Sequence, residues 1–228
     1  GLTLSRELNE KLGVQLSPEL LRLALTHRSF AYESGGLPTN ERLKFLGDSV
    51  LGLVITEALY ERFPDLDESR LSPLRSGVVN MRALAAIART LNLGAALHIG
   101  KGEEVTGGRD KNSILADAFE ALIGAIYLEL GFEKSKTIIL QLMSDAIEEA
   151  ITRGSGLDGK TALQEIVAAK GWLPPEYRVA ESGPDHDKSF EAIAIVNGHE
   201  FPVGRGKSKR EAEQDAARMA FEAINNLN

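Results

Sequence analysis

The sequence contains no cysteine, one tryptophan and no apolar run that approaches the length of a membrane span. Because there is no cysteine, a disulfide framework is excluded, which is compatible with a reducing compartment. The N-terminus shows no signal-peptide pattern. These absences lead us to expect a cytoplasmic protein without a membrane partner.

An excess of positive charge is also missing, since 26 lysines and arginines stand against 33 acidic residues, for a formal net charge of −7. Proteins that bind nucleic-acid phosphates are usually basic, so the total charge alone argues against such a partner. The total says little, however, when acids gather at one site and basic residues at another. The 228 residues, 43% of them hydrophobic, predict one or two ordinary globular domains.

Residues 1–151 predict an almost entirely helical domain. Ser17, Pro18 and Glu19 form the combination of cap, proline and acid that is typical of a helix start. Ser72 and Pro73 repeat the first part of it. Apolar residues recur at helical spacing in the predicted helices, which cover residues 40–62, 74–91, 112–130 and 135–151.

The hydrophobic period changes after a glycine-rich segment, RGSGLDG at 153–159, so we place a linker at 152–159 and a second domain at 160–228. Asn197 and Gly198 predict a tight hairpin turn, and Ser208 and Glu211 predict a capping box. The expected elements are a helix at 161–170, strands at 177–179, 189–196 and 199–204, and a closing helix at 208–227. This order predicts a small α+β domain.

Ionisable residues fall on one face of two predicted helices. In NERLKFLGDS, at 40–49, Glu41, Lys44 and Asp48 are spaced i, i+3 and i+7. In SILADAFEALIG, at 113–124, Asp117 and Glu120 are spaced i and i+3. Either face alone is compatible with simple solvation. Two such helices side by side would instead bring carboxylates together, which is the arrangement that hard cations such as Mg²⁺ prefer.

These motifs resemble those of ribonuclease III. NERLKFLGDS matches the family signature NERLEFLGDS except at Lys44, where the family has a metal-binding glutamate. The resemblance extends to THRSF at 26–30, to TGG and SILADAFEALIGAIYL within 106–128, and to GRGKSKREAEQDAA at 204–217, which is similar to a double-stranded-RNA-binding domain. It covers nearly the whole chain.

The resemblance implies an all-α endonuclease domain at 1–151, followed by an α+β (α-β-β-β-α) double-stranded-RNA-binding domain. It implies a homodimer that forms through the endonuclease domain and uses Mg²⁺, with Mn²⁺ as a substitute. Such enzymes cut double-stranded RNA to leave 5′-phosphates and short 3′ overhangs. They process ribosomal RNA precursors and other structured transcripts, including messenger RNA.

The family's site residues map onto acids of this chain. Asp48, Asp117 and Glu120 correspond to metal-site acids, and Asp48, Glu120 and Glu41 to residues that contribute to catalysis. Glu68 corresponds to an acid near the RNA cleft, although a solvated acid at a helix start explains it equally well. In this reading the metal makes water a nucleophile and neutralises charge on the scissile phosphate.

Lys44 departs from the family pattern at a metal ligand. It removes one carboxylate and places an ammonium where a dication would bind, so we expect weakened Mg²⁺ binding and impaired cleavage. Lys44 would pair with Asp48 or with the acids of the other helix, or else turn to solvent while a water replaces the lost ligand. The alternative function is a double-stranded-RNA-binding protein that does not cut.

The second domain carries three candidate RNA-contact regions: the closing helix start, the first helix and the loop between the first two strands. Cations and backbone amides converge at the helix start, which favours phosphate binding. The residues that the resemblance assigns are Gln164, Glu165, His186, Lys207, Ser208, Lys209 and Arg210. Such domains recognise A-form shape more than sequence. Trp172 and Phe190 are expected in the core.

Two further segments have less specific interpretations. His27, in the THRSF motif, is expected to pack between helices and make supporting hydrogen bonds rather than to act as an acid or base. The segment TGGRDK at 106–111 predicts a flexible turn. Arg109 and Lys111 there contact phosphates or belong to a solvated loop.

Overall fold

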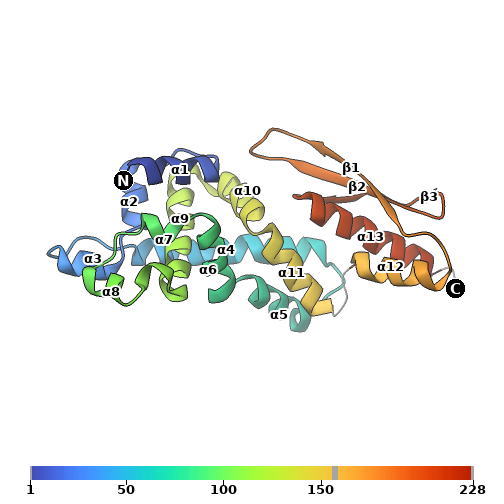
Figure 1. Cartoon of the computed structure of the whole chain (residues 1–228), viewed down its shortest axis with the longest axis horizontal. Coiled ribbons are helices and arrows are strands. Elements are labelled where there is room, and N and C mark those ends of the chain that lie inside the picture. Colours follow the sequence, from blue (N-terminus) through green and yellow to red (C-terminus); the bar gives the residue numbers. More distant parts are fainter. Residues whose placement is uncertain (1, 156–158, 227–228) are drawn as a thin grey trace. The chain divides into compact units, whose positions relative to one another are not determined.

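The computed structural model describes residues 2–155 and 159–226, which form helices and one small sheet (Figure 1). Contacts divide the chain into two compact units, Gly1–Met143 and Ser144–Asn228. None of the described helices is long and apolar enough to cross a membrane.

The regular elements of the first unit are all helices among its described residues, as the sequence predicts. Its elements are α1 (Leu2–Leu12), α2 (Pro18–Ala24), α3 (Arg28–Glu33), α4 (Glu41–Arg62), α5 (Glu68–Val78), α6 (Met81–Thr90), α7 (Leu93–Ala96), α8 (Lys101–Val105), a 3-10 turn η1 (Gly108–Asp110), α9 (Asn112–Leu130) and α10 (Phe132–Leu142). The long helices α4 and α9 have the most extensive mutual contact and centre the core. Leu51, Ile55, Phe119 and Leu122 are fully buried there.

Glycines let α4 and α9 approach each other backbone to backbone. A Cβ added at Gly47 would lie 1.7 Å from the Glu120 carbonyl oxygen, and one at Gly124 would lie 2.3 Å from the Leu43 carbonyl oxygen. Real side-chain atoms do not fit at such distances, so only glycine permits this contact. The close approach places the ionisable face of α4 beside that of α9.

The predicted helix at 74–91, starting from Ser72 and Pro73, is wrong. Helix α5 instead begins at Glu68 and runs through Pro73, and α6 begins after Asn80. The Asn80 side chain donates to the Ser76 and Gly77 carbonyls and accepts from the Ala83 amide. One asparagine therefore ends α5 and caps α6. These hydrogen bonds determine where the second helix begins, whereas Pro73 lies inside α5 and starts no helix.

The predicted helix at 135–151 is two helices, α10 and α11 (Ser144–Ser155), separated at Met143. Met143 has φ −101° and ψ 6°, outside the regular helical range. Asp145 in the first turn of α11 favours a new start there. Helix α11 extends into the predicted linker, and residues 156–158 of that linker lie outside the described residues.

The second unit continues from α11 with α12, an antiparallel sheet and a closing helix. Its elements are α12 (Gly159–Ala169), β1 (Glu176–Ser182), β2 (Ser189–Val196), β3 (His199–Glu200), β4 (Gly204–Gly206) and α13 (Lys209–Asn225). Strand β2 pairs with β1, β3 and β4. Asn197 and Gly198 both have positive φ, 51° and 78°, which confirms the predicted hairpin turn.

The third predicted strand, 199–204, is interrupted. It appears as β3 and β4, with Pro202 between them. Proline has no amide hydrogen to donate to a neighbouring strand, so the ladder breaks there. The chain then resumes pairing with β2, where Gly204 lies opposite Ala192.

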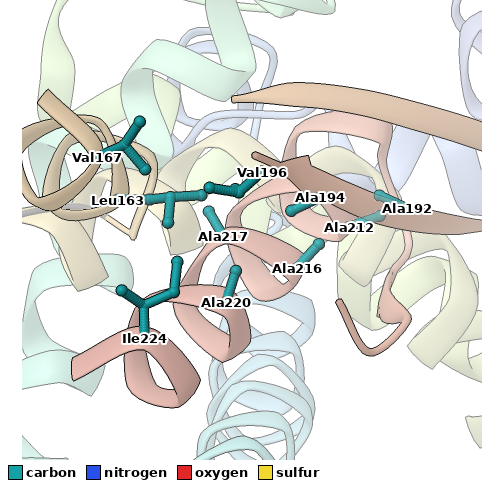
Figure 2. Close-up of a cluster of buried hydrophobic side chains, with 10 residues drawn as sticks. All are labelled: Leu163, Val167, Ala192, Ala194, Val196, Ala212, Ala216, Ala217, Ala220 and Ile224. Carbon is teal, nitrogen blue, oxygen red and sulfur yellow. The ribbon is translucent and has the colours of Figure 1, made fainter. Parts of the chain in front are cut away.

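Alanines form much of the core of this unit (Figure 2). Ala212, Ala216 and Ala220 of α13 are fully buried against the sheet. A Cβ added at Gly204 would lie 2.2 Å from the Ala216 amide nitrogen, so β4 and α13 are in close contact. Trp172 and Phe190 pack against this cluster, which confirms that they belong to the core.

Candidate functional site

The contact between α4 and α9 joins Lys44 to Asp117. The Lys44 Nζ atom lies 3.3 Å from Asp117 Oδ2, and both side chains are about two-fifths exposed, at 42% and 41%. Of the orientations that the sequence left open, Lys44 therefore adopts pairing with the opposite helix. An ammonium thus neutralises one of the three predicted metal-site acids.

The other two predicted metal-site acids, Asp48 and Glu120, are joined by a hydrogen bond. Glu120 is only 9% exposed, whereas Asp48 is exposed. Burial raises the pKa of Glu120 to about 8, with further contributions from the hydrogen bond to Asp48 and from the charges of Asp48 and Asp117. At neutral pH the Glu120 carboxyl therefore keeps its proton and donates it toward the Asp48 carboxylate.

These side chains do not fit a divalent cation in their present arrangement. Within 2–155 and 159–226, no group of three or more His, Cys, Asp or Glu side chains is placed to hold a metal ion. A dication needs deprotonated oxygen ligands, but Asp117 is paired with Lys44 and Glu120 holds a proton. The ammonium of Lys44 adds direct repulsion.

The remaining two predicted acids lie at the surface. Glu41 is exposed at the start of α4, where the Asn40 side chain accepts no capping hydrogen bond and the Glu41 amide donates to Thr39 Oγ1. Glu68 is exposed at the start of α5. Glu41, Asp48, Asp117 and Glu120 thus share the α4–α9 contact region, whereas no described contact connects Glu68 with it.

A cleft of about 810 Å³ opens beside the Lys44–Asp117 pair and was not predicted. His27 and Tyr32 line it together with Lys44 and Asp117. The His27 ring accepts a hydrogen bond from the Ser29 amide and so caps α3. The expected supporting role of His27 is confirmed, but its position on the cleft wall could not be read from the motif.

The segment 106–111 holds its two cations in fixed contacts. Arg109 donates to the Gly94 and Leu97 carbonyls and pairs with Glu104. Lys111 Nζ lies 3.0 Å from Glu103 Oε1. Arg109 therefore secures the chain before α9, a role that neither sequence interpretation included. No signal in the sequence indicates those two carbonyl acceptors.

In the second unit, the predicted cationic cluster surrounds the start of α13. Ser208 caps the helix by accepting from the Glu211 amide, and Glu211 accepts from the Lys207 amide. The predicted capping box is thus present. The amide that donates to the Glu211 carboxylate is that of Lys207 rather than that of Ser208. Lys209 and Arg210 are exposed and form no ion pair among the described residues.

The other predicted RNA contacts are exposed as well. The ion pair between Lys207 and Asp187, 3.7 Å long, brings the α13 start beside the loop that carries His186. Gln164 and Glu165 lie on the exposed side of α12, which packs against α13. The ion pair thus joins the start of α13 directly to the loop that carries His186. The third region, on α12, is connected to them through the packing of α12 against α13.

Comparisons with known proteins agree with this division into two units. Residues 17–146 match a family model described as Ribonuclease-III-like, and residues 160–224 match one described as Double-stranded RNA binding motif. A protein named Ribonuclease 3 from Thermobifida fusca (strain YX) is 56% identical over 219 residues, which is 96% of this chain and 91% of that protein. A Ribonuclease 3 from Streptomyces coelicolor (strain ATCC BAA-471 / A3(2) / M145) is 55% identical over 95% of this chain and 79% of its own length.

A solved structure resembles the first unit. It is the nuclease domain of ribonuclease III from Campylobacter jejuni, described as flexible in a region involved in dimer formation. It is 46% identical to this chain and superposes with a TM-score of 0.58, over 61% of this chain and 96% of its own.

Proposed function

Because this chain belongs to the ribonuclease III family, we propose that it binds double-stranded RNA as a homodimer and that Lys44 strongly impairs its cleavage step. The observation that carries the proposal is the Lys44–Asp117 ion pair at a predicted metal ligand. The unimpaired reaction would be Mg²⁺-dependent hydrolysis of each strand, leaving 5′-phosphates and short 3′ overhangs. Its substrates would be ribosomal RNA precursors and structured transcripts in the cytoplasm.

Metal dependence is general in this family, and a bound dication supplies an activated water and neutralises charge on the scissile phosphate. In this chain, the Lys44 ammonium pairs with Asp117, and the protonated carboxyl of Glu120 donates a hydrogen bond to Asp48. The four groups thereby satisfy one another without metal. Recruiting Mg²⁺ would require the loss of a proton and the displacement of an ammonium, which is why we expect weak binding.

The RNA-binding part of the proposal rests on the second unit. Lys209 and Arg210 stand at the start of α13, whose amide end favours a phosphate, and Lys207 lies next to them. Gln164 and His186 would contact the minor grooves on either side. These groups are remote in sequence from Lys44, so binding and cleavage are separable.

The dimer part rests on exposed apolar residues of α4. Phe45 is 79% exposed, Leu53 55% and Tyr60 70%, and helical spacing places them along one face. Large apolar side chains in such a row on a soluble domain favour association with a second copy. The dimer formation named for the Campylobacter jejuni nuclease domain supports association through the first unit.

A second candidate function follows from the same observation. If Lys44 abolishes metal binding outright, the chain acts as a double-stranded-RNA-binding protein that holds duplexes without cutting them. The two candidates differ only in residual cleavage. Both predict that duplex RNA is bound without Mg²⁺.

The test compares the chain with its Lys44→Glu variant on one duplex RNA, by cleavage assay with Mg²⁺ and by gel shift without it. We expect Lys44→Glu to increase cleavage at least about a hundredfold, more than the roughly tenfold to hundredfold effect of residues that only support a metal ligand, while affinity for RNA stays the same. Lys134→Glu, a charge reversal at an exposed position of α10, serves as the control and should change neither. Rapid Mg²⁺-dependent cutting by the unaltered chain would refute the impairment.

A further inference from the structure

The hydrogen bonds of His27 determine which of its ring nitrogens carries the proton. Nδ1 lies 3.2 Å from the Ser29 amide nitrogen, which donates to it, and 2.7 Å from Ser29 Oγ. Ser29 Oγ in turn accepts from the Gly100 amide at 2.8 Å, so its own hydrogen is directed to Nδ1. With two donors facing it, Nδ1 is unprotonated, and the neutral ring carries its hydrogen on Nε2.

This Nε2–H group has no hydrogen-bond partner among the described residues, although His27 lines the cleft beside Asp117. Burial lowers the pKa of His27, partly offset by the charge of Glu103, so the ring stays neutral near physiological pH. A neutral donor in a cleft is compatible with an anionic ligand and costs no charge burial.

The charges of the same cleft are mostly paired. Lys44 pairs with Asp117, and Lys111 pairs with Glu103. The Glu33 carboxylate accepts from the Lys101 and Gly102 amides. This leaves Arg28, which lines the cleft and forms no ion pair or side-chain hydrogen bond among the described residues. Arg28 and His27 therefore offer the cleft a guanidinium and an imidazole N–H, on adjacent residues.

We propose that His27 and Arg28 form a phosphate-binding subsite for an RNA strand that lies in this cleft, next to the Lys44–Asp117 pair. The Nε2–H of His27 donates to one phosphate oxygen, and the Arg28 guanidinium supplies charge and further donors. A cleft of about 810 Å³ accommodates a nucleotide. The subsite rests on the proposed function, because it requires RNA to lie over the first unit, and it adds residues that position the strand.

Glu41 and Glu33 are acids of this cleft that form no ion pair among the described residues. Glu41 accepts a long hydrogen bond of 3.5 Å from Thr39, and Glu33 accepts from two backbone amides. Both charges oppose a phosphate. The subsite therefore requires both donors, since the neutral His27 alone does not offset a carboxylate. Loss of either residue is expected to be measurable.

The first experiment is nitrogen-15 NMR of the imidazole groups in the full chain, with a duplex of about 30 base pairs so that RNA extends beyond the roughly 16 that a binding domain covers. The chain has four histidines, so each signal can be assigned. We expect the Nε2–H tautomer of His27 in the free chain, and a shift of its Nε2 signal when RNA is added. His98, which lines a different pocket of the same unit, is the internal control, and its signals should not shift when RNA is added.

The second experiment measures RNA affinity against salt for two variants. His27→Asn keeps an oxygen that can cap the Ser29 amide but removes the Nε2 donor. We expect about tenfold to a hundredfold weaker binding, the effect of one hydrogen bond to a charged group, with an unchanged salt slope. Arg28→Gln should weaken binding and reduce the slope by about one.

The outcomes separate the two proposals. If duplex RNA binds with normal affinity, the His27 signal does not move and His27→Asn binds like the unaltered chain, the subsite is wrong while the proposed function stands. If the chain binds no duplex RNA, both fail. If His27→Asn melts at the same temperature as the unaltered chain, misfolding is excluded as the cause of weaker binding.

Discussion

Lys44 Nζ lies 3.3 Å from Asp117 Oδ2, so a cation from α4 neutralises an acid of α9 at the contact between the two helices. Both side chains are about two-fifths exposed, and pairs of this kind usually stabilise a fold by less than about 1 kcal/mol. The pair therefore matters little for folding. Its consequence concerns ligands, because the same ammonium repels any dication brought to these acids.

Replacing Lys44 by glutamine should separate repulsion from ligation. Lys44→Gln removes the ammonium but supplies no carboxylate, whereas Lys44→Glu does both. We expect Mg²⁺ affinity by titration calorimetry to rise from the unaltered chain to Lys44→Gln and again to Lys44→Glu, each by at least about tenfold. Equal affinities for the glutamine and glutamate variants would show that the lost ligand is unimportant.

The meeting of α4 and α9 was predictable because it depends on local patterns. Helical spacing placed Asp117 and Glu120 on one face, and the family motif placed Lys44 and Asp48 opposite them. The protonation of Glu120 was not predictable, because it follows from burial and from a hydrogen bond to another helix. Sequence spacing reports neither.

Replacing Gly47 by alanine should destabilise the first unit by about 2–4 kcal/mol, because the new Cβ would lie 1.7 Å from the Glu120 carbonyl oxygen. Gly52 on the same helix has no atom within 4 Å of its added Cβ. Gly52→Ala is the matched control and should stabilise the helix by about 0.5–1 kcal/mol. Urea unfolding followed by circular dichroism measures both, and similar effects of the two variants would contradict the close helix contact.

Stability should fall as pH rises, because of Glu120. Its pKa is about 8 in the folded chain against an ordinary value of 4.5, so between these pH values the unfolded chain releases a proton that the folded chain retains. The stabilisation is complete below about pH 4.5 and lost by about pH 8. Glu120→Gln cannot ionise, so this loss, roughly 4–5 kcal/mol, should disappear in urea titrations across that range. A fall of equal size in the variant would assign the pH dependence to other groups.

One error in the predicted helices has a physical origin that hydrophobic spacing does not report. The boundary between α5 and α6, like the segment before α9, depends on side-chain contacts with carbonyls and amides. Asn80 bonds to two carbonyls behind it and one amide ahead of it, and Arg109 bonds to the distant carbonyls of Gly94 and Leu97. Pro202 was visible in the sequence and could have indicated the break in the third strand.

RNA binding should depend on the two cations at the start of α13. Replacing Lys209 and Arg210 by alanine is expected to weaken binding to duplex RNA and to reduce the salt slope by about two, one for each lost phosphate contact. Arg178→Ala removes a cation that instead pairs with Glu200 on the sheet and should have little effect. Filter binding over a range of salt concentrations gives the slopes, and equal slopes for all variants would place the phosphate contacts elsewhere.

The exposed apolar face of α4 should hold the dimer together. Replacing Phe45 by glutamate puts a charge at a position that is 79% exposed in the single chain but that would be buried against a second copy. We expect Phe45→Glu to be monomeric at micromolar concentration in sedimentation experiments, where the unaltered chain is dimeric. Val105→Glu, at an apolar residue of α8 that is 86% exposed, is the control and should remain dimeric. A monomeric unaltered chain, or a dimeric Phe45→Glu variant, would show that this face is not the interface.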